Sequence, residues 1–160
     1  MMAQYSSRIT DVMRVWDNGI ATSFDPYRAD LVQYNESIRL QTGAKYGVAT
    51  KWHFNGKIYE DSHSPMPIPD MSGLVYATPG WKQWVVINPD GTTRFLIDVP
   101  HVREHSNPSE GYLGDPRHSK GDSLHLMYGE GSDGYQDDCR FFFDMHTGQL
   151  LRTHFVGRHW

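Results

Sequence analysis

Residues 123–156 read SLHLMYGEGSDGYQDDCRFFFDMHTGQLLRTHFV, and apolar and polar side chains alternate in them over three successive runs. Alternation with a period of two is typical of β-strands that bury one face. Glycine-containing segments at residues 129–134 and 145–148 separate the runs and have the composition of hairpin loops. The stretch therefore predicts an antiparallel meander of three strands.

The second loop of this meander sets the register of its last two strands. A β-bulge at Gly148, in the left-handed position after a type I turn, pairs Phe142 with Arg152. The same count pairs Arg140 with His154. These pairs depend on the register, because a slip of one residue moves every side chain to the opposite face.

The first loop brings His125 opposite Asp138 if Tyr128 lies opposite Tyr135. One face of the meander is then aromatic, and the other combines ionisable with apolar side chains. This second surface, the mixed face, comprises His125, Met127, Asp138, Arg140, Phe142, Leu150, Arg152 and His154. Such a mixture is typical of a ligand cavity, although it also suits the solvent side of a sheet whose other face is the core.

The composition of the chain fits one mainly β domain. Its 160 residues suffice for a single core. Aromatic residues make up 13% of the sequence, and they favour strands over long helices. No internal repeat is evident, so we expect residues 1–160 to form a single domain.

The first 43 residues predict two amphipathic helices. An apolar stripe at helical spacing comprises Ile9, Val12, Met13, Trp16 and Ile20, on a helix that is expected to end near Asn18-Gly19. A second helix is expected to begin at residues 25–26, where an N-capping aspartate precedes a proline, and to end at residues 42–43. Each helix needs an apolar surface to cover.

The remaining chain, residues 44–160, predicts an antiparallel sheet of about eight strands. An Asn-Gly dipeptide at residues 55–56 is a strong hairpin signal. Residues 84–87 are apolar without alternation, so we expect their strand to be covered on both faces. Ahead of the meander, the predicted strands are Val48–Phe54, Lys57–Asp61, Leu74–Thr78, Gln83–Ile87 and Thr93–Val99.

Together these elements define an α+β fold that is predominantly β. Two helices followed by an antiparallel meander favour a strongly curved sheet or a small barrel, with the helices across one opening or face. The outline resembles lipocalin-like barrels and the cone-shaped sheets of the nuclear-transport-factor-2-like class at the level of fold. That resemblance implies a cavity and no particular activity.

Residues 100–122 form a long polar segment that we expect to be a loop or lid. His101 and His105 would share one face if a helical turn began there, and His118 would be a third ligand. Such a set resembles a transition-metal site. Histidines in a polar loop are usually solvated and no carboxylate partner is defined, so we assign no metal and keep the metal site as an alternative.

Several classes of partner lack support in the sequence. No phosphate loop, GxGxxG, GxSxG or CxxC motif is present, so no cofactor is expected. The net charge of −4 is spread along the chain without a basic run, which disfavours nucleic acid. One cysteine, no apolar leader and no long apolar run favour a cytoplasmic protein without a membrane partner. Exposed edge strands would favour a homodimer.

The mixed face of the meander is the predicted active site. General acid–base catalysis needs a histidine that a carboxylate orients, and a fixed cation that stabilises negative charge. His125 and His154 are the expected base and acid. Asp138 would orient the first imidazole, and Arg140 would supply the cation. The expected substrate-binding residues are His53, Met127, Phe142 and Arg152.

The predicted function is a cofactor-independent enzyme of the lyase, dehydratase or isomerase type. Its substrate would be a small, largely apolar molecule, aromatic ones included, bound in the cavity of the barrel. A non-catalytic binding or carrier protein with the same pocket is the first alternative. An enzyme that depends on a metal held by His101 and His105 is the second.

Overall fold

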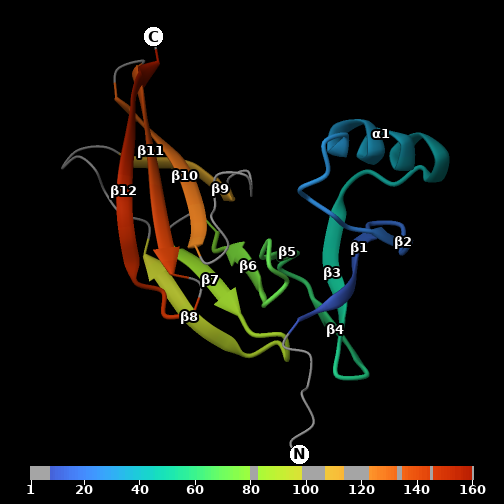
Figure 1. Cartoon of the computed structure of the whole chain (residues 1–160). Helices are drawn as coiled ribbons and strands as arrows, with labels where there is room; N and C mark the ends of the chain where they lie inside the picture. Colours follow the sequence, from blue (N-terminus) through green and yellow to red (C-terminus); the bar gives the residue numbers. More distant parts are fainter. Residues whose placement is uncertain are drawn as a thin grey trace, which may run out of the picture. The chain divides into compact units, whose positions relative to one another are not determined.

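A computed structural model describes residues 8–79, 83–98, 107–113, 123–132, 135–144 and 146–159 (Figure 1). Side chains are described for residues 8–79, 83–98, 142–144 and 146–152, and the other strands are described by their backbone and its pairing. In this part of the chain there are twelve strands and one helix. The strands form three four-stranded sheets.

The chain divides into two compact units, and each is treated by itself. The first unit comprises Met1–Tyr76 and Val86–Arg94, and the second comprises Ala77–Val85 and Phe95–Trp160. The sheet with the order β2-β1-β3-β4 belongs to the first unit, and the sheet with the order β12-β11-β10-β9 belongs to the second. In the third sheet, β5-β6-β7-β8, strands β6 to β8 contribute residues to both units.

The first element is a hairpin of β1 (Thr10–Trp16) and β2 (Ala21–Ser23), so the prediction of a helix here is wrong. Its turn contains Gly19 in the left-handed region, with φ at 84°. Val12 and Trp16 are both buried, as the helical stripe required, because residues four apart also share one face of a strand. The Asn-Gly turn and the β-branched residues therefore outweigh the helical spacing.

The helix α1 (Leu31–Thr42) begins later than predicted and is the one helix among the described residues. Asp25 caps a turn instead of a helix, since its carboxylate accepts a hydrogen bond from the N–H of Tyr27 at 3.0 Å. The helix ends where the sequence indicated. Gly43 adopts a left-handed conformation with φ at 75°, and its N–H donates to the carbonyl of Arg39.

The sheet of the first unit continues with β3 (Gly47–Phe54) and β4 (Lys57–Asp61), which form the hairpin predicted around Asn55-Gly56. Figure 1 shows α1 at the end of this sheet where β3 begins. Trp16, Ile38 and Ala44 form a buried cluster there, with Tyr34 packed against it. Side chains from a strand, the helix and the following loop thus hold α1 on the sheet.

The third sheet consists of β5 (Met66–Pro67), β6 (Leu74–Ala77), β7 (Gln83–Ile87) and β8 (Thr93–Asp98). β7 has the predicted bounds and lies between β6 and β8. Residues 84–87 are all at most 5% exposed, which confirms that both faces of this strand are covered. β5 is a short strand in a segment for which no strand was predicted.

The second unit contains the predicted meander as β10 (Ser123–Ser132), β11 (Tyr135–Asp144) and β12 (Leu150–His159). A further strand, β9 (Asn107–Leu113), pairs with β10 and lies within the predicted loop or lid. Each of the three described sheets is open, with two edge strands. The predicted barrel or curved sheet preceded by two helices is therefore wrong. The fold has one helix and open, mainly antiparallel sheets.

Candidate functional site

The last hairpin of the meander has the predicted register over the mixed face. Arg140 lies opposite His154, and Phe142 lies opposite Arg152. Next to the turn the register differs from the prediction, because the N–H of Asp144 donates to the carbonyl of Gln149 and Phe143 pairs with Leu150. A register shift between Phe142 and Phe143 separates this end of the hairpin from the two predicted pairs. The two predicted pairs are therefore confirmed, but the turn alone does not produce them, since the irregularity between Phe142 and Phe143 sets their register as well.

The first hairpin has a different register. Ser132 pairs with Tyr135, so β10 and β11 continue through residues 129–131 to a two-residue connection. His125 consequently lies opposite Phe142, and Asp138 lies opposite Gly129. Four residues along a strand separate Asp138 from the partner of His125, which is about 13 Å. The predicted pairing of His125 with Asp138 is wrong, because the glycines were taken for a loop and are strand.

The observed register still groups six predicted site residues in two adjacent rows across β10, β11 and β12. One row is His125, Phe142 and Arg152, and the other is Met127, Arg140 and His154. Residues directly opposite each other share a face of the sheet.

Within these rows, the side chains of Phe142 and Arg152 are described. Phe142 is 6% exposed, and the guanidinium of Arg152 lies 4.1 Å from its ring centroid. An arginine at that position interacts with the face of the ring and covers it. In this arrangement the face of the Phe142 ring is covered by Arg152 and does not line an open pocket.

The other predicted residues lie apart from these rows. His53 is on β3 of the first unit, is 43% exposed, and has its Nδ1 3.8 Å from a carboxylate oxygen of Asp11. His101, His105 and His118 lie outside the described residues. In the described ranges, no group of three or more His, Cys, Asp or Glu residues has the arrangement of a metal site.

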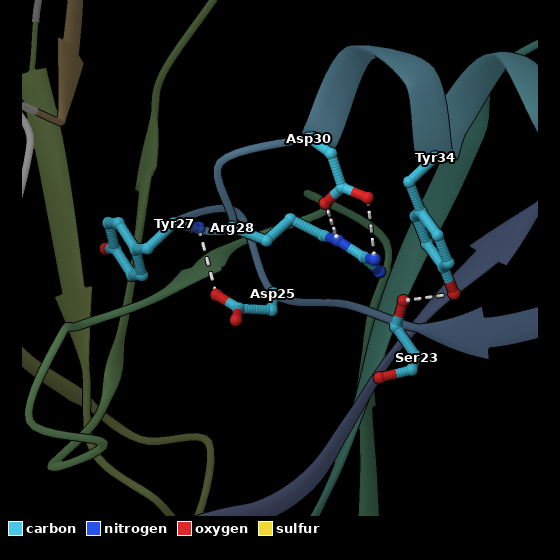
Figure 2. A network of polar contacts seen from close by, with 6 residues as sticks. All are labelled: Ser23, Asp25, Tyr27, Arg28, Asp30 and Tyr34. Carbon is cyan, nitrogen blue, oxygen red and sulfur yellow. Dashed lines mark hydrogen bonds and ion pairs between the residues drawn. The ribbon is translucent and has the colours of Figure 1, made fainter.

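A network of polar contacts holds the segment between β2 and α1, as Figure 2 shows. Arg28 donates two hydrogen bonds to the carboxylate of Asp30, from Nε to Oδ1 at 2.6 Å and from Nη2 to Oδ2 at 3.2 Å. The same guanidinium lies 3.9 Å from the ring centroid of Tyr34. The Tyr34 hydroxyl donates to the carbonyl of Ser23 at 3.2 Å. Because Tyr34 is on α1 and Ser23 is on β2, these contacts tie the helix to the sheet.

This network supports the helix and is not a reaction centre. Asp30 precedes α1 and makes no capping hydrogen bond, since Arg28 occupies its carboxylate. The hydroxyl of Tyr27 donates to the carbonyl of Pro67 at 2.6 Å. Burial, and to a smaller extent the charges of two nearby aspartates, raise the pKa of the Tyr27 phenol well above its usual value. The phenol therefore stays protonated at neutral pH and acts as a fixed donor.

An Asp–His pair that the sequence reading missed lies after β4. The Oδ1 atom of Asp61 accepts a hydrogen bond from the backbone N–H of His63 at 2.8 Å. The same oxygen lies 2.7 Å from Nδ1 of the His63 imidazole. The imidazole stacks on Tyr76, with ring centroids 4.3 Å apart. A carboxylate on Nδ1 is the geometry of a histidine base. However, the His63 side chain is 55% exposed, and a short Asp-x-His turn would make the same contacts.

The helix α1 has an exposed side, the outer face, formed by Val32, Glu36, Arg39 and Leu40. These residues fall within about 100° around a helix of 3.6 residues per turn. Val32 is 77% exposed and Leu40 is 78% exposed. The outer face thus presents two aliphatic side chains beside one acidic and one basic side chain. In the sequence, this exposed side could have been predicted from Val32 and Leu40, because they are apolar but lie outside the apolar stripe that faces the core.

The sequence matches no protein-family model and no curated protein. A chain in the solved structure of Tne2 in complex with Tni2 has a similar fold, with a TM-score of 0.60. The two chains are 13% identical, and the match covers 92% of this chain and 99% of that one. At this identity the likeness concerns the fold alone. In the described ranges, no helix is long and apolar enough to cross a membrane.

Proposed function

We propose that this protein is a protein-binding module and that the outer face of α1 is part of its recognition surface. The observation that carries the proposal is the exposure of Val32 and Leu40, at 77% and 78%. Burying one such aliphatic side chain against a partner contributes about 1.5–3 kcal/mol. Helices that present aliphatic anchors to a groove are a common mode of protein recognition.

The helix is held firmly enough to serve as such an anchor. Tyr34 and Ile38 fix its inner side to Trp16, and Gly43 ends it with a backbone hydrogen bond to Arg39. The contacts of Arg28 fix its beginning (Figure 2). A surface that is already ordered loses little conformational entropy on binding, which favours affinity.

The fold comparison supports the same class of function. The similar chain comes from the structure of Tne2 in complex with Tni2, so this fold takes part in a protein complex there. Among the described sheets, the open edge of β2 offers further backbone groups to a partner. We therefore place a protein among the partners of this chain, ahead of a small molecule.

Site-specific photo-crosslinking in the producing cells tests this proposal. A photo-reactive residue at position 40 should give a discrete crosslinked species, because the side chain there would contact the partner. Ile58 on β4 is the matched control, since it is also aliphatic and is 65% exposed. In a second variant, the photo-reactive residue is at position 32 and Leu40 is replaced by Asp (Leu40→Asp). This variant should no longer give the crosslinked species. The same crosslinks at positions 40 and 58, or none at 40, would contradict the proposal.

An acid–base enzyme at the mixed face is a second candidate, and the register favours it. His125, Arg140 and His154 fall in two neighbouring rows of one sheet. Two histidines and one arginine in neighbouring rows are the residue types that proton transfer next to a developing negative charge requires. Asp138 takes no part in this version, because it lies opposite Gly129.

This second candidate needs a ligand before it can be tested. Small aromatic compounds would be screened for thermal stabilisation of the protein, and turnover of any stabilising compound would follow. His154→Gln should lower turnover by about 10² to 10⁴ while ligand affinity changes little, because the titrating proton is lost. Arg140→Lys should also lower it, since an ammonium cannot replace a planar guanidinium. Full activity of His154→Gln would remove the acid–base assignment.

A further inference from the structure

Arg14 on β1 lies between two aromatic rings. Its guanidinium carbon is 4.3 Å from the ring centroid of Phe24 and 5.5 Å from that of Trp16. The side chain is partly buried, and it lies across the backbone of Gly47, where a Cβ would come within 2.9 Å of its Cδ. The aromatic rings and the missing side chain at residue 47 therefore fix the direction of this guanidinium.

A second guanidinium faces the same indole. Arg39 on α1 lies 5.7 Å from the ring centroid of Trp16. Its Nε donates to the carbonyl of Lys45 at 3.0 Å, and its Nη1 is 3.7 Å from a carboxylate oxygen of Glu36. Two positive side chains thus converge on one aromatic ring from a strand and from the helix.

Arg14 differs from Arg39 in its partners. Among the described residues, no carboxylate forms an ion pair with the Arg14 guanidinium, which lies against two rings and beside the backbone of Gly47. Burial and, secondly, the charge of Arg39 lower the pKa of Arg14. A guanidinium has five N–H donors in a planar fork, and those of Arg14 are open to an acceptor from outside the chain.

We infer that the pair of Arg14 and Arg39 receives an Asp or Glu side chain of a protein partner. A carboxylate between the two guanidiniums would relieve their repulsion and accept a bidentate hydrogen bond from Arg14. The inference rests on the proposed function, because Arg39 follows Val32 by seven residues and shares the outer face of α1. The aliphatic side chains would supply contact area, and the arginine pair would select an acidic partner.

The test uses the ¹⁵N-labelled full chain and synthetic hexaglutamate at low ionic strength, where exposed charges are least screened. The signals followed are the Arg14 Nε–Hε and the Trp16 indole N–H, assigned from Arg14→Gln and Trp16→Phe. Hexaglutamate should shift both signals along a saturable curve, and hexaglutamine should not. Arg14→Gln should weaken hexaglutamate binding by at least about tenfold, because charge-assisted hydrogen bonds are lost.

Two further variants separate geometry from charge. Gly47→Ala keeps every charge but displaces the Arg14 side chain, so it should weaken hexaglutamate binding as well. Lys57→Gln removes one positive charge at the β3–β4 hairpin and should leave binding unchanged. Equal losses in Lys57→Gln and Arg14→Gln would mean nonspecific attraction and would overturn the inference.

Inorganic phosphate distinguishes the source of the anion. Hexaglutamate should remain bound in the presence of an equal concentration of phosphate, and phosphate that displaces it from Arg14 would reassign the site to a phosphate group. No saturable shift of the Arg14 signal would overturn the inference directly. The titration needs no partner, so its failure is distinct from a missing crosslink at position 40, which would contradict the proposed function.

Discussion

Within each of the two units, a different kind of contact holds the elements together. The first unit includes two very short strands, β2 with three residues and β5 with two, and side chains join its elements across long stretches of sequence. Trp52 donates to the carbonyl of Pro89 at 2.7 Å, and Thr50 donates to that of Pro65 at 2.7 Å. In the second, three strands of ten residues pair through their backbones.

This difference indicates where each unit is sensitive to substitution. An element of two or three residues has few backbone hydrogen bonds of its own, so single buried side chains decide whether it forms. A ten-residue hairpin depends instead on its register, which the turns determine. We therefore expect core substitutions to matter most in the first unit and turn substitutions to matter most in the second.

The largest expected effect is that of Trp16→Ala in the first unit. Trp16 is 1% exposed, packs against Ile38 and Ala44, and donates its indole N–H to Thr22 at 2.9 Å. Its loss should lower the free energy of unfolding by about 3–5 kcal/mol in urea denaturation. Trp16→Phe, which keeps a ring but loses the hydrogen bond, should cost about 1–2 kcal/mol.

Leu151→Ala is the control for the second unit. Leu151 is 53% exposed, and surface substitutions usually change stability by less than about 0.5 kcal/mol. A cost for Trp16→Ala no greater than that of Leu151→Ala would show that the helix and its sheet are peripheral to the stability of the chain.

The same tryptophan explains why the sequence was misread at its beginning. Ile9, Val12 and Trp16 are buried in the structure, whereas Met13 of the predicted stripe is half-buried and Ile20 is 40% exposed, so the choice of core residues was right in part although the element was wrong. Burial at intervals of four satisfies both a helix and a strand, and only the Asn-Gly turn after Trp16 distinguishes them. In the meander the alternation has a period of two, which no helix satisfies, so its three strands were predicted, although the first extends through residues 129–132, which were taken for a loop.

A comparison of two glycine turns has the next largest expected effect. Gly148 has φ at 76° and faces Phe95, where a Cβ would come within 2.7 Å of the ring. Gly19 has φ at 84° with nothing within 4 Å of the same position. Gly19→Ala should cost about 1–2 kcal/mol from backbone strain alone. Gly148→Ala should cost roughly 1 kcal/mol more, because the ring must move.

Thermal and urea unfolding of the two variants measures this difference. The outcome decides whether the turn of the second unit is fixed by local conformation or by its packing against β8 as well. Equal losses in the two variants would mean that Phe95 moves aside freely and that conformation alone sets the turn.

The candidate site could be predicted only in part. The pairs Arg140–His154 and Phe142–Arg152 were predicted correctly, although the pairing of Phe143 beside the turn was not. The position of Asp138 did not, because Gly129 and Gly131 fit a loop or a strand equally well in a sequence. Arg14 contacts Phe24 and Gly47, which are distant from it in the sequence, and no local sequence pattern predicts these contacts.

The smallest expected effect concerns acid stability, and it compares one aspartate in each unit. The carboxylate of Asp17 accepts hydrogen bonds from the N–H groups of Lys45 and Tyr46, and that of Asp144 accepts them from His146 and Thr147. In both cases these backbone hydrogen bonds lower the pKa of the carboxyl group below its usual value.

A lowered pKa in the folded state means that the unfolded state binds protons more readily. The stabilising contribution of each aspartate is therefore complete above the unfolded-state pKa of about 3.9, and it is lost as the pH falls through the lower folded-state pKa. Asp17→Asn and Asp144→Asn should each make the unfolding free energy less dependent on pH in this acidic range. Urea titrations at a series of pH values below about 5 measure it. If Asp144→Asn alone flattens the curve, the acid sensitivity belongs to the turn of the meander, and the long-range contact of Asp17 with the loop before β3 contributes nothing to it.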